Sequence, residues 1–173
     1  MATCRIRLPF VPQLSPDYPL DQLDGLNVWY EARLTEEGVE DMQNLTTMNL
    51  VDVILHTRVP VGRLVDWVDQ AFLLIHLEPV ERKQLTKKRR SGSTEGADTR
   101  SGLHTRIALR RVGIRTATDL LKAVDRLEDY GARLRATGMD VDQLRILATV
   151  LRSEEGLTPV WNWQQNGVPR AAG

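Results

Sequence analysis

The sequence predicts an all-α protein built from two small helical bundles in tandem, each of about four helices. Apolar residues recur at three- and four-residue spacing through most of the chain, which is the period of an amphipathic helix. Residues that cap helix starts and glycines that stop helices divide this pattern into short elements. The two halves also repeat one order of elements, which indicates two copies of a unit.

Size and composition are those of an ordinary helical protein. The chain has 173 residues, of which 42% are hydrophobic, enough for one domain or two small ones with a core. Its one cysteine, Cys4, excludes an internal disulfide framework and a Cys-rich zinc site, and favours a reducing compartment. The longest apolar stretch, 71–77, is far shorter than the roughly 18 residues of a membrane span. We therefore expect a cytoplasmic protein without a transmembrane segment.

The first 24 residues predict a Pro-rich extended arm. They contain Pro9, Pro12, Pro16 and Pro19. Proline fixes φ and removes a backbone donor, so a helix is not expected over 1–24.

Residues 25–80 predict the first helical domain, which is acidic. Asn27 can cap a helix that begins at Val28, and Gly38 lies where a left-handed helix stop belongs. A short helix is expected from about Asp41.

Thr46 or Thr47 could cap a third helix, whose inward side chains are expected to be Leu50, Val51, Ile54 and Leu55. The longest helix is predicted to start near Pro60, which suits a first turn, and to end before Pro79. Its apolar stripe comprises Val61, Leu64, Val65, Val68, Phe72 and Ile75.

Residues 81–101 predict a basic flexible linker, because they are polar and rich in glycine and serine. A basic cluster opens this segment: Arg82, Lys83, Lys87, Lys88, Arg89 and Arg90. Such a cluster can bind nucleic acid or an anionic membrane surface, or it can keep a linker solvated.

Residues 102–156 predict a second, basic helical domain. One helix is expected to stop at Gly113, a second to be capped near Thr116, and a last long helix to run from Asp140 to Gly156. Residues 157–173 form a tail with two tryptophans and no helical period. This tail could dock across the helices or insert into a partner.

Charge divides the chain into two halves. Residues 1–80 hold 5 Lys and Arg against 12 Asp and Glu, a net charge of −7. Residues 81–173 hold 18 against 11, a net charge of +7. These halves can attract each other or an oppositely charged partner.

An internal repeat relates the halves. "RLTEEGVEDMQNL" matches "ALRRVGIRTATDL" at an offset of 75 residues. This offset places Leu34, Gly38, Val39 and Leu45 on Leu109, Gly113, Ile114 and Leu120. A second match, "VPVGRL" with "MDVDQL", has an offset of 80, which implies a five-residue insertion in the second copy.

The repeat resembles the small helix-hairpin-helix or SAM-like helical domains over about 25–77 and 102–153. In this family a Gly-aliphatic-Gly hairpin precedes a helix that ends in Glu-x-Gly-Ile; here "GLN" at Gly25 to Asn27 precedes "EEGVEDMQNL". Asn27 stands where the second glycine would be, since asparagine tolerates a left-handed turn. "GLH" at Gly102 to His104 is the poorer counterpart. The chain is also similar to tandem cytoplasmic domains of unknown function in actinobacteria.

This resemblance implies that backbone N–H groups of the hairpin could hold a nucleic-acid phosphate, which also requires a basic surface. The glutamates of the first copy would repel phosphate. The second copy is better suited through Arg106, Arg110, Arg111 and Arg115. The alternative is a solvated arginine-rich face.

Enzyme activity is not predicted. The three histidines are scattered, and no nucleophile elbow, Gly-rich phosphate loop or Cys/His constellation is found in the sequence. Asp66 and Asp69 are expected on a solvated face or paired with Arg63. We expect no catalytic residues, metal, cofactor or small-molecule ligand.

Aromatic residues favour a protein partner. Trp29, Trp161 and Trp163 are candidate protein-binding residues, because tryptophan is enriched at binding hot spots, whereas Trp67 is expected in the core. The leading hypothesis is a non-catalytic interaction or adaptor module that could also self-associate. The alternative is sequence-nonspecific DNA or RNA binding by the second copy and the basic linker.

Overall fold

The computed structural model describes residues 18–90, 101–136 and 140–166, with side chains for 18–77, 105–135 and 140–166. Over these residues the chain is helical and contains no β-strand, which confirms the all-α prediction. Residues 1–17 of the predicted arm lie outside the described residues. Its last part holds a short 3₁₀ turn, η1, Leu20–Gln22, and a single β-bridge between Pro19 and Asp41.

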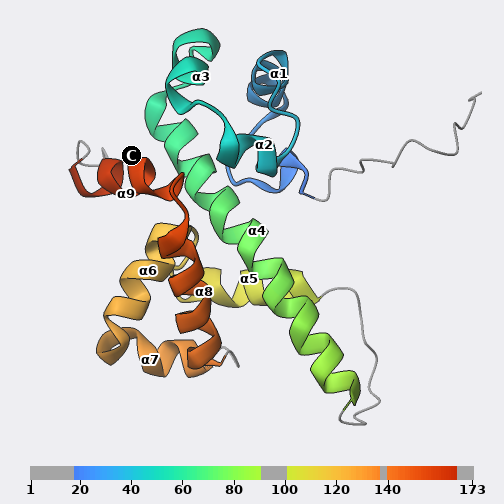
Figure 1. The fold of residues 1–173 in the computed structure, drawn as a ribbon, viewed down its shortest axis with the longest axis vertical. Coiled ribbons are helices and arrows are strands. Elements are labelled where there is room, and N and C mark those ends of the chain that lie inside the picture. The colour runs from blue at the N-terminus through green and yellow to red at the C-terminus, as the bar shows by residue number, and fades with distance from the viewer. Residues whose placement is uncertain (1–17, 91–100, 137–139, 167–173) are drawn as a thin grey trace, which may run out of the picture.

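The described helices, drawn in Figure 1, are α1 (Val28–Glu36), α2 (Met42–Thr47), α3 (Leu50–Thr57), α4 (Val61–Arg90), α5 (Ser101–Arg111), α6 (Ala117–Asp125), α7 (Leu127–Ala136), α8 (Val141–Ser153) and α9 (Leu157–Asn166).

Four helices begin where the sequence predicts, three of them behind the predicted caps Asn27, Thr116 and Asp140. The side chains of Asn27, Asp41, Thr116 and Asp140 each accept a backbone N–H of the helix that follows. The predicted cap of α3 is wrong, because Asn49 caps it and the hydroxyls of Thr46 and Thr47 donate to Gln43 O within α2. These local bonds keep both threonines inside the preceding helix.

The 75-residue repeat is present in local backbone geometry. Gly38 and Gly113 have φ of +79° and +88°, in the left-handed region that favours glycine. The residues after them close the same hydrogen bond at 2.9 Å, from Val39 N to Leu34 O and from Ile114 N to Leu109 O. Each stop leads into a capped helix, so both copies share one helix-stop-helix unit.

The hairpin expected before each copy differs from the structure. Asn27 has an extended φ of −118° and serves as a helix cap, so it does not replace a left-handed glycine. Gly25, with φ +75°, is the left-handed residue of that turn. Gly102 to His104 lie within α5, which begins at Ser101 and ends at Arg111.

Two segments expected to be irregular are helical. α4 continues past Pro79 to Arg90, so residues 81–90 of the predicted linker are helical, while 91–100 lie outside the described residues. Glu, Lys, Arg and Gln at 81–90 are strong helix formers, and they continue the helix although Pro79 removes one backbone donor. The first part of the predicted tail forms α9, with Pro159 in its first turn.

Helix α4 is the centre of the packing. α2 packs against it from the first half, and α5, α6, α8 and α9 pack against it from the second (Figure 1). The predicted stripe faces inward, with Leu64, Val65, Val68 and Phe72 buried, and Trp67 is fully buried as expected. Buried residues of both halves form one apolar core around α4.

The turn between α8 and α9 passes close to the first half. α8 ends at Ser153. The prediction that Gly156 stops this helix is therefore wrong. A Cβ at Gly156 would lie 2.9 Å from Phe72 Cζ and 3.2 Å from Thr46 O. Glycine is therefore required there by close packing against α4 and α2.

We expect Gly156→Ala to lower the free energy of unfolding by about 1–3 kcal/mol, because the methyl group would push into an aromatic ring and a backbone carbonyl. Gly62→Ala is the control, since a Cβ there meets nothing within 4 Å; that change should be neutral or stabilising by up to about 1 kcal/mol. Urea unfolding measures both. Equal stability of the two variants would contradict the close packing.

Candidate functional site

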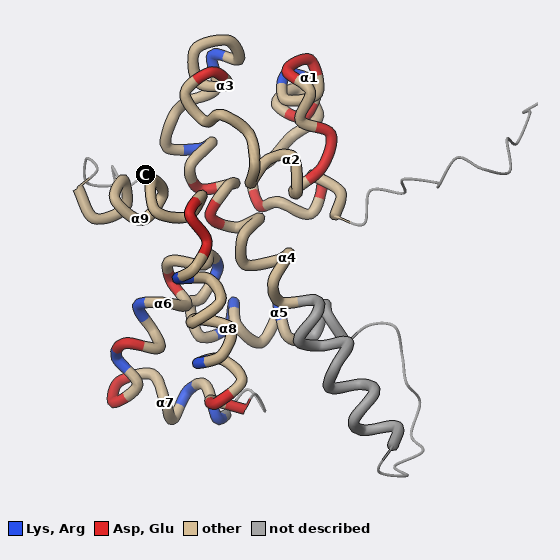
Figure 2. The backbone as a smooth tube through the Cα atoms, viewed as in Figure 1, with Lys and Arg blue, Asp and Glu red and all other residues tan. Residues whose placement is uncertain are grey.

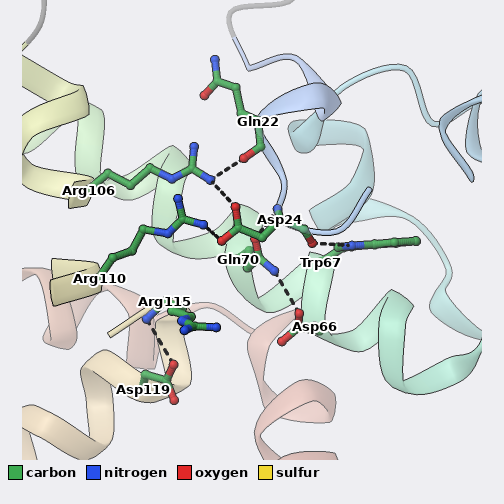
Figure 3. Close-up of polar contacts among 9 residues, drawn as sticks. All are labelled: Gln22, Asp24, Asp66, Trp67, Gln70, Arg106, Arg110, Arg115 and Asp119. Carbon is green, nitrogen blue, oxygen red and sulfur yellow. Dashed lines mark hydrogen bonds and ion pairs between the residues drawn. The ribbon is translucent and has the colours of Figure 1, made fainter. Parts of the chain in front are cut away.

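A turn at Asp24 joins the N-terminal segment to α4. The backbone N–H of Asp24 donates to Gln70 Oε1 at 2.8 Å, and the indole N–H of the buried Trp67 donates to Asp24 O at 3.1 Å (Figure 3). The amide of Gln70 in turn donates to Asp66 Oδ2 at 2.9 Å. Both backbone groups of Asp24 are therefore held by side chains of α4, which fixes the direction of its carboxylate.

Two arginines of α5 converge on that carboxylate (Figure 3). Arg110 forms an ion pair with Asp24 Oδ2, and Arg106 Nη2 lies 3.4 Å from Asp24 Oδ1. Arg106 also donates to the carbonyl oxygen of Gln22, and burial lowers the pKa of its guanidinium. Half of the four arginines proposed for nucleic acid in the second copy are thus engaged with the acidic half of the same chain.

The other candidate cations lie elsewhere. Arg111 and Arg115 are exposed near the turn between α5 and α6, where the backbone N–H of Arg115 donates to Asp119 Oδ2 at 3.2 Å (Figure 3). The six residues of the basic cluster lie on the last third of α4, and their side chains are outside the described part: Arg82, Lys83, Lys87, Lys88, Arg89 and Arg90.

A buried carboxylate of α4 lies at the start of α6. Asp69 of α4 accepts the backbone N–H of Thr118 at 2.9 Å and its hydroxyl at 2.5 Å. Asp69 is fully buried, so its expected place on a solvated face is wrong. Burial raises the pKa of this carboxyl from 3.8 to about 6, against the opposing effect of the bonds from Thr118.

Three N–H groups at or near the start of α6 that could face a phosphate therefore have acceptors within the chain. Thr118 donates to Asp69, Asp119 donates to the hydroxyl of Thr116, and Arg115 donates to Asp119. A phosphate would have to displace these acceptors before it could bind the start of α6.

The described residues hold no group of three side chains that could bind a metal ion. Of the histidines, His56 contacts Asp52 O within its own helix, and His76 lies between Phe72 O and Glu154 Oε1, at 2.8 and 2.9 Å. The latter contact joins α4 to the end of α8. Both histidines thus lie against groups of the same chain.

Exposed apolar side chains are found on each of two neighbouring helices. α1 presents Val28 and Trp29, and α3 presents Val51 and Leu55, with Trp29 57% and Leu55 70% exposed. α1 and α3 lie side by side and contact each other (Figure 1). These four residues are called the α1–α3 face below. The guanidinium of Arg33 covers the Trp29 ring, at 5.4 Å from its centre.

The surroundings of this face are acidic. Residues 18–77 contain 3 Lys and Arg against 10 Asp and Glu, a net charge of −7. Figure 2 shows acidic residues on α1 and on the segment from α1 to α2. Apolar side chains exposed on an acidic part of the chain are suited to a partner that is apolar and basic.

The remaining candidate tryptophans lie on α9. Trp163 is 44% exposed, whereas Trp161 is half-buried and has the ammonium of Lys122 over its ring at 5.9 Å. α9 packs against α4, so this part of the predicted tail is docked on the protein.

Sequence reasoning missed the outward direction of Val51 and Leu55, which were expected to face inward. Within α3 the buried residues are Val53 and Thr57. Because the apolar residues of α3 cover more than half of its circumference, its period could not select the inward face. The apolar composition itself was the available signal, since such a helix is normally covered all round.

Within the described residues, no helix combines the length and the apolar character needed to cross a lipid bilayer. No protein-family model, curated protein or solved structure matches the chain.

We expect Asp69 to make stability fall as pH rises from about 4 to about 6. The folded carboxyl holds its proton up to about 6 and the unfolded one only to 3.8, so folding takes up a proton between these values and the gain is lost above them. At 1.36 kcal/mol per pKa unit, the loss is roughly 3 kcal/mol.

Asp69→Asn should remove this part of the pH dependence, because an amide stays neutral and can still pair with Thr118. Urea unfolding from pH 4 to pH 7 measures it. Asp21→Asn, at an exposed site in η1, should leave the slope unchanged. If the stability of Asp69→Asn falls with pH as steeply as that of the wild type, Asp69 is not a buried titrating carboxyl.

Proposed function

We propose that this protein is a non-catalytic interaction module of the bacterial cytoplasm that acts through protein–protein contacts. The α1–α3 face carries the proposal: four large apolar side chains are exposed on two adjacent helices. Exposed apolar patches of this kind mark interaction sites, and tryptophan is a frequent hot-spot residue. Trp163 on α9 adds a second, smaller candidate contact.

The resemblance to helix-hairpin-helix and SAM-like domains fits this proposal as a scaffold. The shared helix-stop-helix unit positions α2 and α6 against α4, and its polar groups are used within the chain. On the first half, the apolar side chains of the α1–α3 face remain exposed among residues whose net charge is acidic. We infer that the helix-stop-helix unit supports a binding face and does not itself bind phosphate.

Sequence-nonspecific binding of DNA or RNA is the second candidate. The exposed guanidiniums of Arg111 and Arg115, and a net charge of +5 from six basic residues against Glu81 over 81–90, favour it. The occupied donors at the start of α6 and the pairing of Arg106 and Arg110 with Asp24 count against it.

Leu55→Asp should reduce capture of a protein partner at least about tenfold, because it places a charge among the exposed apolar side chains of the α1–α3 face. Cross-linking of the intact chain in lysate of its own cells, with the bound protein quantified by mass spectrometry, measures this. Gln165→Asp adds the same charge at an exposed site on α9 and should leave capture unchanged. A chain that stays monomeric and captures no protein would refute the proposal.

Nucleic-acid binding is tested by retention of the intact chain on duplex DNA across a salt series. If Arg111 and Arg115 contact phosphates, replacing both with alanine should lower the salt slope by about two. If the alternative is wrong, the wild-type chain is not retained even at low salt.

A further inference from the structure

Apolar side chains recur at every second position near the start of the sequence: Cys4, Ile6, Leu8 and Phe10. Arg5 and Arg7 lie between them, and residues 1–16 contain no acidic residue. Successive side chains of an extended backbone point to opposite sides, so this spacing predicts one apolar side and one basic side. Proline favours extended backbone at the residue before it, and Pro9 follows Leu8 directly. Residues 4–10 are called the arm segment below.

The arm segment is attached close to the α1–α3 face. Tyr18 O accepts the backbone N–H of Met42 at 2.9 Å, which holds this point of the chain against the start of α2. Residues 37–41 separate α1 from α2, so even at full extension the far end of α1 lies at most about 40 Å from Tyr18. The arm segment lies 8 to 14 residues before Tyr18 and can reach roughly 26–46 Å. It is therefore long enough to lie on α1 and on α3, which contacts α1.

The charges next to α1 are complementary to those of the arm segment. Residues 28–41 contain five acidic residues and one arginine, a net charge of −4. The arginine, Arg33, pairs with Glu36 at 2.9 Å. Glu37 and Glu40 are exposed, and neither forms an ion pair with another of the described residues. The described chain therefore leaves these two carboxylates available to further guanidinium groups.

We propose that the arm segment binds the α1–α3 face of its own chain and covers it. Its apolar side packs on the exposed side chains of the two helices, and Arg5 and Arg7 reach the carboxylates at the end of α1 along their flexible stems. The tether gives the arm segment an effective concentration on the order of 1 mM at the face, so a weak contact is sufficient. A second copy in dilute solution has no such advantage.

This contact rests on the proposed function and regulates it. A protein partner that uses the α1–α3 face must displace the arm segment before it binds. The affinity of the partner is then reduced by the fraction of chains in which the face is covered.

A spin label tests the contact in the full-length protein, because Cys4 is the only cysteine and accepts one nitroxide. We expect the label to broaden the amide NMR signals of α1 and α3 and to leave those of α8 sharp. Leu55→Asp, in the face, and Leu8→Asp, in the arm segment, should each reduce this broadening at least about threefold, since a charge disrupts an apolar contact. Circular dichroism confirms that the variants fold.

Two control variants carry the same added charge outside the contact. Gln165→Asp is at an exposed site of α9, and Gln13→Asp is between the arm segment and Tyr18. Both should leave the broadening unchanged.

Two outcomes would overturn the proposal. Equal broadening in the wild type, Leu55→Asp and Leu8→Asp means that the arm segment moves freely near the face without binding it. Broadening of the same strength between a spin-labelled chain and a separate isotope-labelled chain means that the occupant is a second copy. In either case the proposed function survives if the α1–α3 face still captures a different protein.

Partner capture separates this inference from the proposed function. If both hold, Leu8→Asp should raise capture from lysate at least about threefold over the wild type, since the face is open in more of the chains. Broadening that depends on Leu55 and Leu8, in a chain that captures no protein, supports the contact and refutes the proposed function.

Discussion

The two halves of the molecule depend on one helix that must be covered on both sides. α4 receives α2 from the first half and α6, α8 and α9 from the second, and its buried residues belong to one continuous core. Two polar links at this helix set the geometry. The backbone of Asp24 is held by Trp67 and Gln70, and the carboxylate of Asp69 holds the start of α6. A negative charge on the Asp69 carboxylate is costly to bury, so its hydrogen bonds from Thr118 must be kept.

These internal links change how the charge of the chain is understood. The attraction between an acidic and a basic half is partly satisfied at Asp24, where two guanidiniums converge. Two of the arginines that looked available for phosphate from the sequence, Arg106 and Arg110, hold α5 against the N-terminal turn. Arg111 and Arg115 stay exposed, and so do the apolar side chains of the α1–α3 face, on which the proposal of protein contacts rests.

Local signals in the sequence were sufficient for much of the fold. Helix caps such as Asn27 and Thr116, and the stops at Gly38 and Gly113, depend on bonds within five residues and were predicted correctly. Features that depend on distant contacts were not. Nothing near Asp69 in the sequence indicates burial against Thr118, which lies 49 residues away. The composition of α3 likewise does not show which side faces the core.

The order of elements along α4 also matters during synthesis. The helices that cover its second side, α6, α8 and α9, all follow it in the chain. Until they leave the ribosome, the carboxylate of Asp69 lacks Thr118, and the ring of Phe72 lacks the turn at Gly156. A nascent chain that pauses after α4 therefore carries an apolar helix side with an uncompensated polar group, and this is the stage at which a chaperone would be needed most.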